Sequence, residues 1–281
     1  MRKLPLITVV ALGAGISLAT PLSLAAEVYY TTVYGGAEIA SITLHGGKIT
    51  TKAVGPTDVP STHPELFPGC ANLAMSKSGT LYAVCGDLFG TQQLATIDLK
   101  TGHANIFGIP TAGLAVMSLA YGPDGTLYAA GDCNLTQVSP GVIECTKGSD
   151  PNFNSLYTID VSTGAFTPVG PTGAPQYFMD LAFDRHGRLY GVTTTLSPSY
   201  IPAILYRINP STGAATKIVD LVGSSQVMGL AFGEDGKLYG TDFVDVPGLY
   251  SIDMKTGFET TIAVLPFPLS SSLELVSAPE E

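Results

Sequence analysis

The sequence has no tryptophan, few charged residues and especially few basic ones. Only 13% of its 281 residues are charged while 45% are apolar, and this balance excludes an intrinsically disordered chain. Lysine and arginine number 13 against 23 aspartate and glutamate, so the formal charge of -10 excludes a nucleic-acid-binding surface over the whole chain. The sequence also lacks the GxSxG, HExxH and phosphate-loop motifs of several enzyme classes.

The first 26 residues have the pattern of a secretory signal peptide. A short basic head precedes the apolar run 4–18, and small residues lead to a cleavage point after Ala25 or Ala26. We therefore expect a signal peptide at 1–26 and one mature domain at 27–281, secreted or periplasmic. No later apolar run reaches the length of a membrane span, so none is expected after cleavage.

An internal repeat organises the remaining sequence. A strand, a turn with glycine at its end and a second strand recur in four segments: NLAMSKSGTLYAVCGD from Asn72, SLAYGPDGTLYAAGD from Ser118, DLAFDRHGRLYGVTT from Asp180 and GLAFGEDGKLYGTDF from Gly229. Each is followed by a strand of LYxID type, a Thr-Gly turn and a last strand. The repeat therefore predicts units of four strands, which we letter a to d.

The turn glycines lie 46, 62 and 49 residues apart, which suits the four-stranded blades of a β-propeller. Residues 27–55 contain only strands b, c and d of a unit, and residues 272–276 can supply the missing strand a. Closure of the ring by the C-terminal strand would remove exposed sheet edges. We predict an all-β, five-bladed propeller, with six blades as the alternative.

The LAFxxDGxLYG and LYxIDxxTG patterns resemble the secreted and periplasmic β-propellers of the NHL and YVTN type, and are similar to gluconolactonase-like propellers. The resemblance covers nearly the whole mature chain. It implies a module that binds a protein, a glycan or a small molecule, without a cofactor. The alternative that it implies is a metal-dependent hydrolase of lactonase type.

The turns a–b and c–d are short and alike, whereas the connections b–c and d–a vary in length. We call the first side of the disc the turn side and the other the loop side. Variable loops on a repeated scaffold usually carry function. The longest b–c connection, in blade 3, runs from about Cys133 to Asn154. We therefore predict a monomeric binding module that uses the loop side, and favour this over an enzyme.

Strand a of each blade should line the central channel. Its aligned first positions are Asn72, Ser118, Asp180, Gly229 and Ser272, and Asp180 is the one charged residue among them. The predicted ligand-binding residues are those of the channel and of the loop side: Asn72, Ser118, Asp180, Tyr177, Tyr200, Asp132 and Asp242. In the hydrolase alternative, Asp180 and Asn72 would hold Ca²⁺ through oxygen ligands. The tyrosines that recur in strand b are predicted to pack between blades: Tyr82, Tyr128, Tyr190 and Tyr239.

Export would place the four cysteines in an oxidising compartment. A turn centred on Lys77 and Ser78 places Cys70 opposite Cys85, at a distance that suits a disulfide. We predict this bond and a second one, between Cys133 and Cys145, within the blade 3 insertion. A bond between Cys85 and Cys133 is the alternative.

Overall fold

The computed structural model describes most of the chain beyond residue 25. Residues 134–139 and 142–146 are described as backbone strands only. The other described ranges are 26–59, 69–86, 91–111, 114–131, 154–194, 202–223, 226–242, 247–268 and 272–276.

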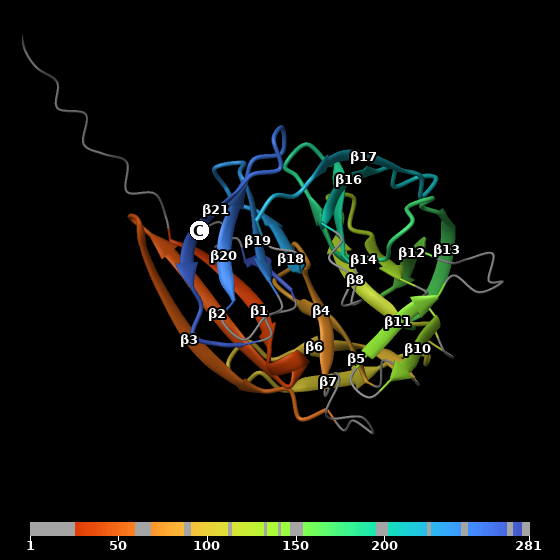
Figure 1. Ribbon diagram of the computed structural model, residues 1–281. Helices are drawn as coiled ribbons and strands as arrows, with labels where there is room; N and C mark the ends of the chain where they lie inside the picture. Colours follow the sequence, from red (N-terminus) through yellow and green to blue (C-terminus); the bar gives the residue numbers. More distant parts are fainter. Residues whose placement is uncertain are drawn as a thin grey trace, which may run out of the picture.

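Five antiparallel sheets of four strands surround a central axis (Figure 1). From the axis outward, blade 1 consists of β22 (Glu274–Val276), β1 (Glu27–Val33), β2 (Glu38–His45) and β3 (Lys48–Pro56). Blade 2 consists of β4 (Cys70–Met75), β5 (Leu81–Gly86), β6 (Gln92–Ile97) and β7 (Ala104–Phe107). Blade 3 consists of β8 (Val116–Tyr121), β9 (Leu127–Gly131), β12 (Ser155–Asp160) and β13 (Ala165–Pro171).

Blades 4 and 5 follow the same order. Blade 4 consists of β14 (Phe178–Phe183), β15 (Leu189–Thr193), β16 (Ile204–Ile208) and β17 (Ala215–Asp220). Blade 5 consists of β18 (Val227–Phe232), β19 (Leu238–Asp242), β20 (Gly248–Ile252) and β21 (Glu259–Val264). A short 3-10 helix, η1 (Tyr34–Gly36), connects β1 to β2. The prediction of a five-bladed propeller is therefore confirmed.

The C-terminal strand closes the ring, as predicted. Strand β22 pairs antiparallel with β1, and Glu274 lies opposite Tyr30. The Oγ of Ser272 accepts a hydrogen bond from the backbone N–H of Thr32 at 3.3 Å. Blade 1 is thus assembled from both ends of the described chain.

The turns follow the rule that the repeat predicts. In the first a–b turn the N–H of Gly79 donates to the carbonyl of Ser76, and Gly79 has a φ of 82° that favours glycine. In the c–d turns, the polar side chain that ends strand c accepts the N–H two residues further along, and so caps the turn: Asp98, Asp160, Asn209 and Asp253. These short turns therefore serve the fold.

Hydrophobic packing joins each blade to its neighbour. The leucine one position after the first aligned position of each innermost segment is no more than 1% exposed: Leu73, Leu119, Leu181, Leu230 and Leu273. Each repeated tyrosine packs against an aromatic ring of the next blade at 5.2–5.9 Å: Tyr82 on Tyr121, Tyr128 on Phe183, Tyr190 on Phe232 and Tyr239 on Tyr29. The predicted role of these tyrosines between blades is confirmed.

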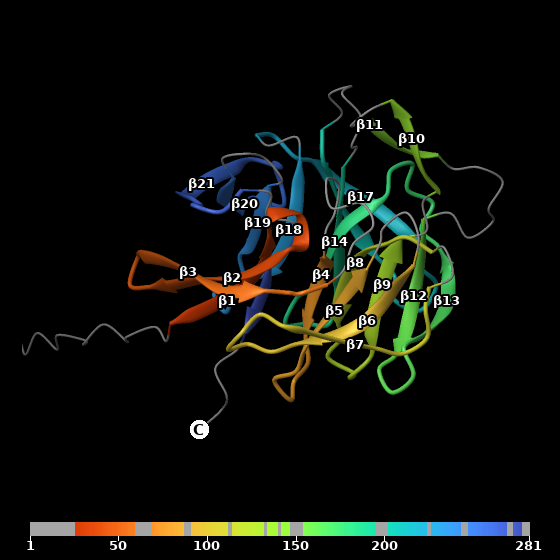
Figure 2. The same cartoon turned by 90° about the horizontal axis from the view of Figure 1, so that it is seen from below.

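The blade 3 insertion contains a separate hairpin, β10 (Asn134–Ser139) and β11 (Val142–Thr146). The two strands form a sheet of their own and pair with no blade strand. Figure 2 shows this hairpin standing beyond the disc, on the side opposite the turn between β4 and β5. The insertion therefore adds to the loop side without contributing to a blade.

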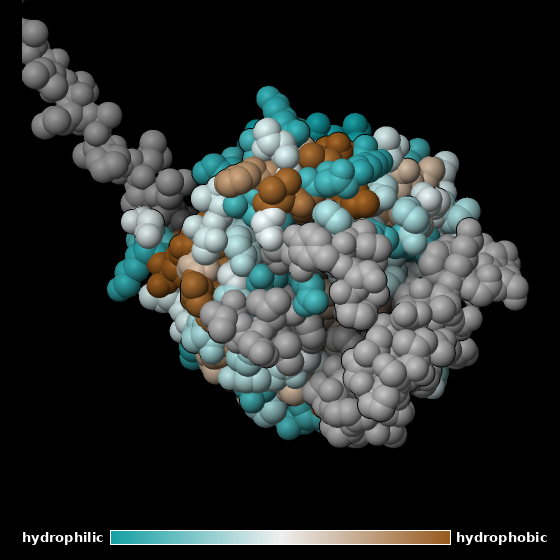
Figure 3. Space-filling model, viewed as in Figure 1, coloured by the Kyte–Doolittle hydropathy of each residue, from teal (hydrophilic) through white to brown (hydrophobic). Residues whose placement is uncertain are grey.

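On the face seen in Figure 3, apolar residues lie in separate patches among polar ones. The most exposed large apolar side chains are Val264 and Phe258, at 65% and 59%. Within the part of the chain that the structure describes, no helix has the length and hydropathy that crossing a bilayer requires.

Candidate functional site: the central channel

The five innermost strands bring the predicted channel residues together around the axis. At the first aligned position, Asn72, Ser118, Asp180 and Ser272 are each no more than 2% exposed. At the fifth member of this ring, Gly229, a Cβ would lie only 2.6 Å from the backbone carbon of Ser272. The strand β18 and the segment that precedes β22 therefore approach closely here.

Asp180 connects three strands of this ring. Its Oδ1 accepts the N–H of Leu181 at 2.9 Å, and its Oδ2 accepts the N–H of Leu230 in β18 at 2.8 Å. Oδ2 also accepts the N–H of Leu273, next to the closing strand, at 3.4 Å. The carboxyl group thus ties blade 4 to blade 5 and to the C-terminal segment.

The ionisation of Asp180 follows from this position. Burial raises the pKa of its carboxyl group well above the ordinary value, and the three backbone N–H donors oppose that rise. The nearby Glu274 carboxylate raises the pKa further, because two negative charges in a buried region repel each other. Asp180 is therefore arranged first of all to hold the ring together.

Asn72 and Ser118 also make bonds within the fold. The Nδ2 of Asn72 donates to the carbonyl of Met117 in the next blade. The Oγ of Ser118 donates to the carbonyl of Ala130 at 3.0 Å and accepts the N–H of the same residue at 3.2 Å. The Oδ1 of Asn72, in contrast, is buried without a hydrogen-bond partner among the described residues.

Glu274 is a channel residue that sequence reasoning missed. Two positions after the first ring, four innermost strands have alanine, and the fifth has Glu274: Ala74, Ala120, Ala182 and Ala231. This departure from the repeated alanine was visible in the sequence. To find it, the alignment of the C-terminal strand had to be continued two positions beyond Ser272.

Glu274 lies at a cavity of about 200 Å³ at the turn-side end of the channel. All five innermost strands line it, and they also contribute the aromatic side chains of Tyr121, Phe183 and Phe232. The Oε1 of Glu274 accepts the N–H of Met75 at 2.9 Å. The side chain of Glu274 is partly exposed to the cavity, and desolvation by the surrounding strands raises its pKa to about 8.

A carboxyl group with this pKa exchanges its proton near neutral pH, and so can act as acid, base or hydrogen-bond donor. Among the described residues, no three His, Cys, Asp or Glu side chains are close enough to share a metal ion. The cavity is therefore a small chamber whose described lining contains one carboxyl group, that of Glu274.

Of the four residues predicted to bind a ligand on the loop side, two are buried in the fold and two lie outside the described residues. Asp242 is buried, and its carboxylate accepts the N–H of Gly248 at 2.7 Å and the hydroxyl of Tyr250 at 2.9 Å, which closes its own b–c connection. Tyr177 is 4% exposed and belongs to a core cluster between blades. Asp132 and Tyr200 lie outside the described residues.

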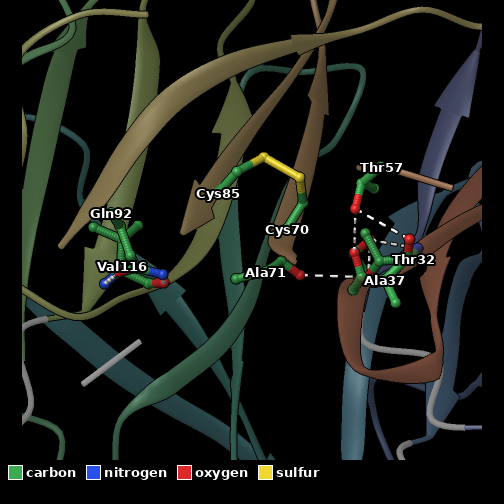
Figure 4. The surroundings of a disulfide bond; sticks show 10 residues. Thr32, Ala37, Thr57, Cys70, Ala71, Cys85, Gln92 and Val116 are labelled. Atoms are coloured by element: carbon green, nitrogen blue, oxygen red, sulfur yellow. Dashed lines mark hydrogen bonds between the residues drawn. A yellow bond between two sulfur atoms is a disulfide. The ribbon is translucent and has the colours of Figure 1, made fainter. Parts of the chain in front are cut away.

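The predicted bond between Cys70 and Cys85 is present and joins β4 to β5 (Figure 4). The predicted register was wrong by one residue next to the turn. A turn centred on Lys77 and Ser78 would pair Met75 with Thr80, whereas Met75 pairs with Leu81. A β-bulge between Cys70 and Leu73 then brings Cys70 opposite Cys85. Blades 3, 4 and 5 have a bulge in the same place, so it belongs to the repeat.

Hydrogen bonds surround this disulfide and join its blade to both neighbours (Figure 4). The Oγ1 of Thr32 donates to the carbonyl of Ala71 at 3.4 Å. The Gln92 side chain accepts the N–H of Val116 at 2.7 Å and donates to its carbonyl at 3.3 Å. The second predicted disulfide involves Cys133, outside the described residues, and Cys145, of which only the backbone in β11 is described.

Comparison with known proteins concerns the fold. No family model and no curated protein matches the sequence. A chain of the nidogen–laminin complex is similar with a TM-score of 0.50 and 12% identity, over 89% of this chain and 98% of that one. At such low identity the likeness bears on the fold alone, and it supports the propeller architecture.

Two further solved structures are similar at slightly lower scores. A gluconolactonase from Xanthomonas campestris has a TM-score of 0.49 and 15% identity, over 89% of this chain and 79% of that one. A protein from Lactobacillus plantarum has a TM-score of 0.49 and 14% identity, over 90% of this chain and 100% of that one.

Proposed function

We propose that this chain is an exported β-propeller binding module that engages a protein, a glycan or a small molecule on its loop side. The β10–β11 hairpin is the observation that carries the proposal. It pairs with no blade strand, so the fold does not require it. An ordered hairpin that stands beyond a closed ring is suited to contact a partner.

The polar side chains that already form hydrogen bonds within the fold also favour the loop side as the binding surface. Asp180 and Ser118 use their side chains to hold strands, and the turn side consists of short, capped turns. The loop side combines the hairpin with the connections that contain Asp132 and Tyr200. These two residues remain our proposed contacts, whereas Asp242 and Tyr177 would act by supporting the loops around them.

The proposed location is the periplasm or the exterior of the cell. The Cys70–Cys85 disulfide supports it, because such bonds persist in oxidising compartments. A signal peptide at 1–26, a single mature domain at 27–281 and a monomeric state belong to the same proposal. Mass spectrometry and size-exclusion chromatography of the exported protein test these three points.

A hairpin replacement tests the binding function. Residues 133–146, which include both Cys133 and Cys145, are replaced by a short glycine-serine linker, and native and variant proteins are applied to a glycan array and an array of secreted proteins. We expect a partner of the native protein that the variant does not bind, with nearly unchanged thermal unfolding. The turn-side variant Asp253→Ala is the matched control and should bind as the native protein does. Equal binding by the hairpin variant would contradict the proposal.

One observation favours the alternative of a metal-dependent lactonase. The buried Oδ1 of Asn72 has no partner among the described residues, and an amide oxygen is a ligand that Ca²⁺ accepts. Thermal unfolding with calcium and with a chelator, together with a lactone hydrolysis assay, distinguishes the two functions. A melting temperature that rises with calcium, and hydrolysis lost in Asn72→Ala, would support the lactonase.

A further inference from the structure

Arginine is concentrated in one blade of this acidic protein. Apart from Arg2, every arginine of the chain lies in blade 4: Arg185, Arg188 and Arg207. The chain as a whole has a formal charge of -10. A local excess of positive charge therefore stands against the overall charge of the molecule.

Two of these arginines share a cavity of about 550 Å³ on the outer strands of blade 4. Arg207 lies opposite Tyr190 in β15 and opposite Thr216 in β17. Opposed residues of neighbouring strands project from the same face, as do alternate residues along one strand. Arg188, Arg207 and Thr216 therefore project from one face, where all three line the cavity.

The bonds of the two arginines leave donors available. The Nε of Arg188 donates to the Oδ2 of Asp184 at 2.5 Å, and this buried carboxylate also accepts the N–H of His186. The ion pair orients Arg188 while its two Nη groups have no partner among the described residues. Arg207 is exposed and forms no hydrogen bond or ion pair with a described residue.

Asn209 and Thr216 complete the polar lining. The Oδ1 of Asn209 accepts the N–H of Ser211 at 2.9 Å, which leaves its Nδ2 to donate. Thr216 adds a hydroxyl group. Beside these donors, apolar side chains of Ile218, Pro210 and Ala214 also line the cavity.

The other blades show that the charge is specific to blade 4. The positions of Arg188, Arg207 and Asn209 correspond by register to Thr80, Thr96 and Asp98 in blade 2, Thr126, Thr158 and Asp160 in blade 3, and Lys237, Ser251 and Asp253 in blade 5. Blade 5 also has a cavity at this place, of about 360 Å³. The fold thus supplies the cavity, and among these four blades only blade 4 has two arginines and an asparagine at these positions, where the others have at most one lysine and an aspartate.

We propose that this cavity of blade 4 is a binding site for a small ligand that bears a carboxylate or sulfate group. Arg207 and the Nη groups of Arg188 bind the anionic oxygens, since guanidinium groups pair in bidentate geometry with carboxylates and with tetrahedral oxyanions. Asn209 and Thr216 donate further hydrogen bonds, and the apolar side chains contact the rest of the ligand. The volume suits a ligand of small-molecule size.

The charge of the whole chain argues for a small ligand over a long polyanion. The field of a protein with a formal charge of -10 repels a polymer that extends past the cavity. A single carboxylate or sulfate group inside the cavity contacts mainly the two guanidinium groups. This site lies on the turn-side part of blade 4 and is independent of binding at the hairpin.

Titration of the full chain with succinate and with sulfate tests the proposal, with binding read from arginine Nε resonances by NMR. We expect saturable shifts, and we expect Arg207→Ser to weaken binding by about tenfold or more. Serine is the residue found at this place in blade 5. The matched control Lys237→Gln removes one positive charge from the corresponding cavity and should change the affinity by less than about twofold.

Three outcomes would overturn the proposal. Equal weakening by Arg207→Ser and Lys237→Gln would mean general attraction of anions, and an absence of saturable shifts in the native protein would mean no site. Heparin, a long polyanion, is the third ligand to be titrated. If heparin bound more tightly than succinate, and Arg207→Ser abolished its binding, the ligand would be a polyanion and the small-ligand proposal would be wrong. The melting temperature of each variant confirms that it is folded.

Discussion

The two ends of the central channel each contain a carboxyl group, but the surrounding residues hold the two groups in different ways. At the loop-side end, Asp180 accepts three backbone N–H groups from three strands, and the Cys70–Cys85 disulfide joins β4 to β5. At the turn-side end, Glu274 accepts one N–H group, from Met75, beside a cavity of about 200 Å³. Both ends contain a carboxyl group whose pKa burial raises.

The difference indicates which end is scaffold and which is adaptable. A buried acceptor with three donors is costly to remove, because each donor would be left without a partner. A carboxyl group beside a cavity can change its protonation, or its partner, at a smaller cost. Variants at the two ends should therefore differ in the size of their effects and in their dependence on pH.

The largest effect is expected from Asp180→Ala. Three buried N–H groups would lose their acceptor, and we expect the free energy of unfolding to fall by about 4 kcal/mol. Chemical denaturation at neutral pH measures the loss. Asp253→Ala, at an exposed turn cap, is the control and should cost less than about 1 kcal/mol. Similar losses in both variants would mean that Asp180 does not hold the ring.

The second effect concerns the disulfide at the same end. The bond closes a segment with a sequence separation of 15, and the double variant Cys70→Ala/Cys85→Ala should lose about 3 kcal/mol of stability. The melting temperature measures the loss, and changing both cysteines avoids an unpaired thiol. A melting temperature equal to that of the native protein would show that the remaining hydrogen bonds are sufficient to hold β4.

The smallest effect is expected at the turn-side end, and it depends on pH. The pKa of Glu274 is raised to about 8 in the folded protein, so the folded state retains a proton that the unfolded state has already released. Stability should therefore fall modestly as the pH rises from about 4.5 to 8, because the partial exposure of Glu274 to the cavity weakens the effect of its raised pKa. Asp180 contributes in the same direction, since its pKa is also raised.

Glu274→Gln isolates this contribution. Glutamine can still accept the N–H of Met75 but does not ionise, so the decline of stability with pH should become shallower. Denaturation midpoints of both proteins between pH 5 and pH 8 provide the comparison. Tyr121 also lines this cavity, and Tyr121→Phe should leave the slope unchanged. An unchanged slope in Glu274→Gln would mean that Glu274 ionises as in water.

Much of the fold could be predicted from the repeat, whereas the chemistry of the channel could not. Glycine at the end of each a–b turn and the tyrosine of strand b recur in every complete blade, so four copies reinforce each interpretation. Asp180 was identified as the charged channel residue, but its three bonds depend on Leu230 and Leu273, which are far away in the sequence. Glu274 was missed because only three strand residues and no turn mark the closing strand.

The sequence by itself determined the five blades and their closure by the C-terminal strand, because the repeat of turns and strands marks each blade. It also predicted the Cys70–Cys85 bond, but only the structure showed the β-bulge that places these two residues opposite each other. The tertiary structure alone decided which carboxyl groups are held and which adjoin a cavity. It also decided that Arg188 and Arg207 face the same cavity. Burial and the donors around a side chain come from strands of different blades, so they follow from the assembled ring and not from any one repeat.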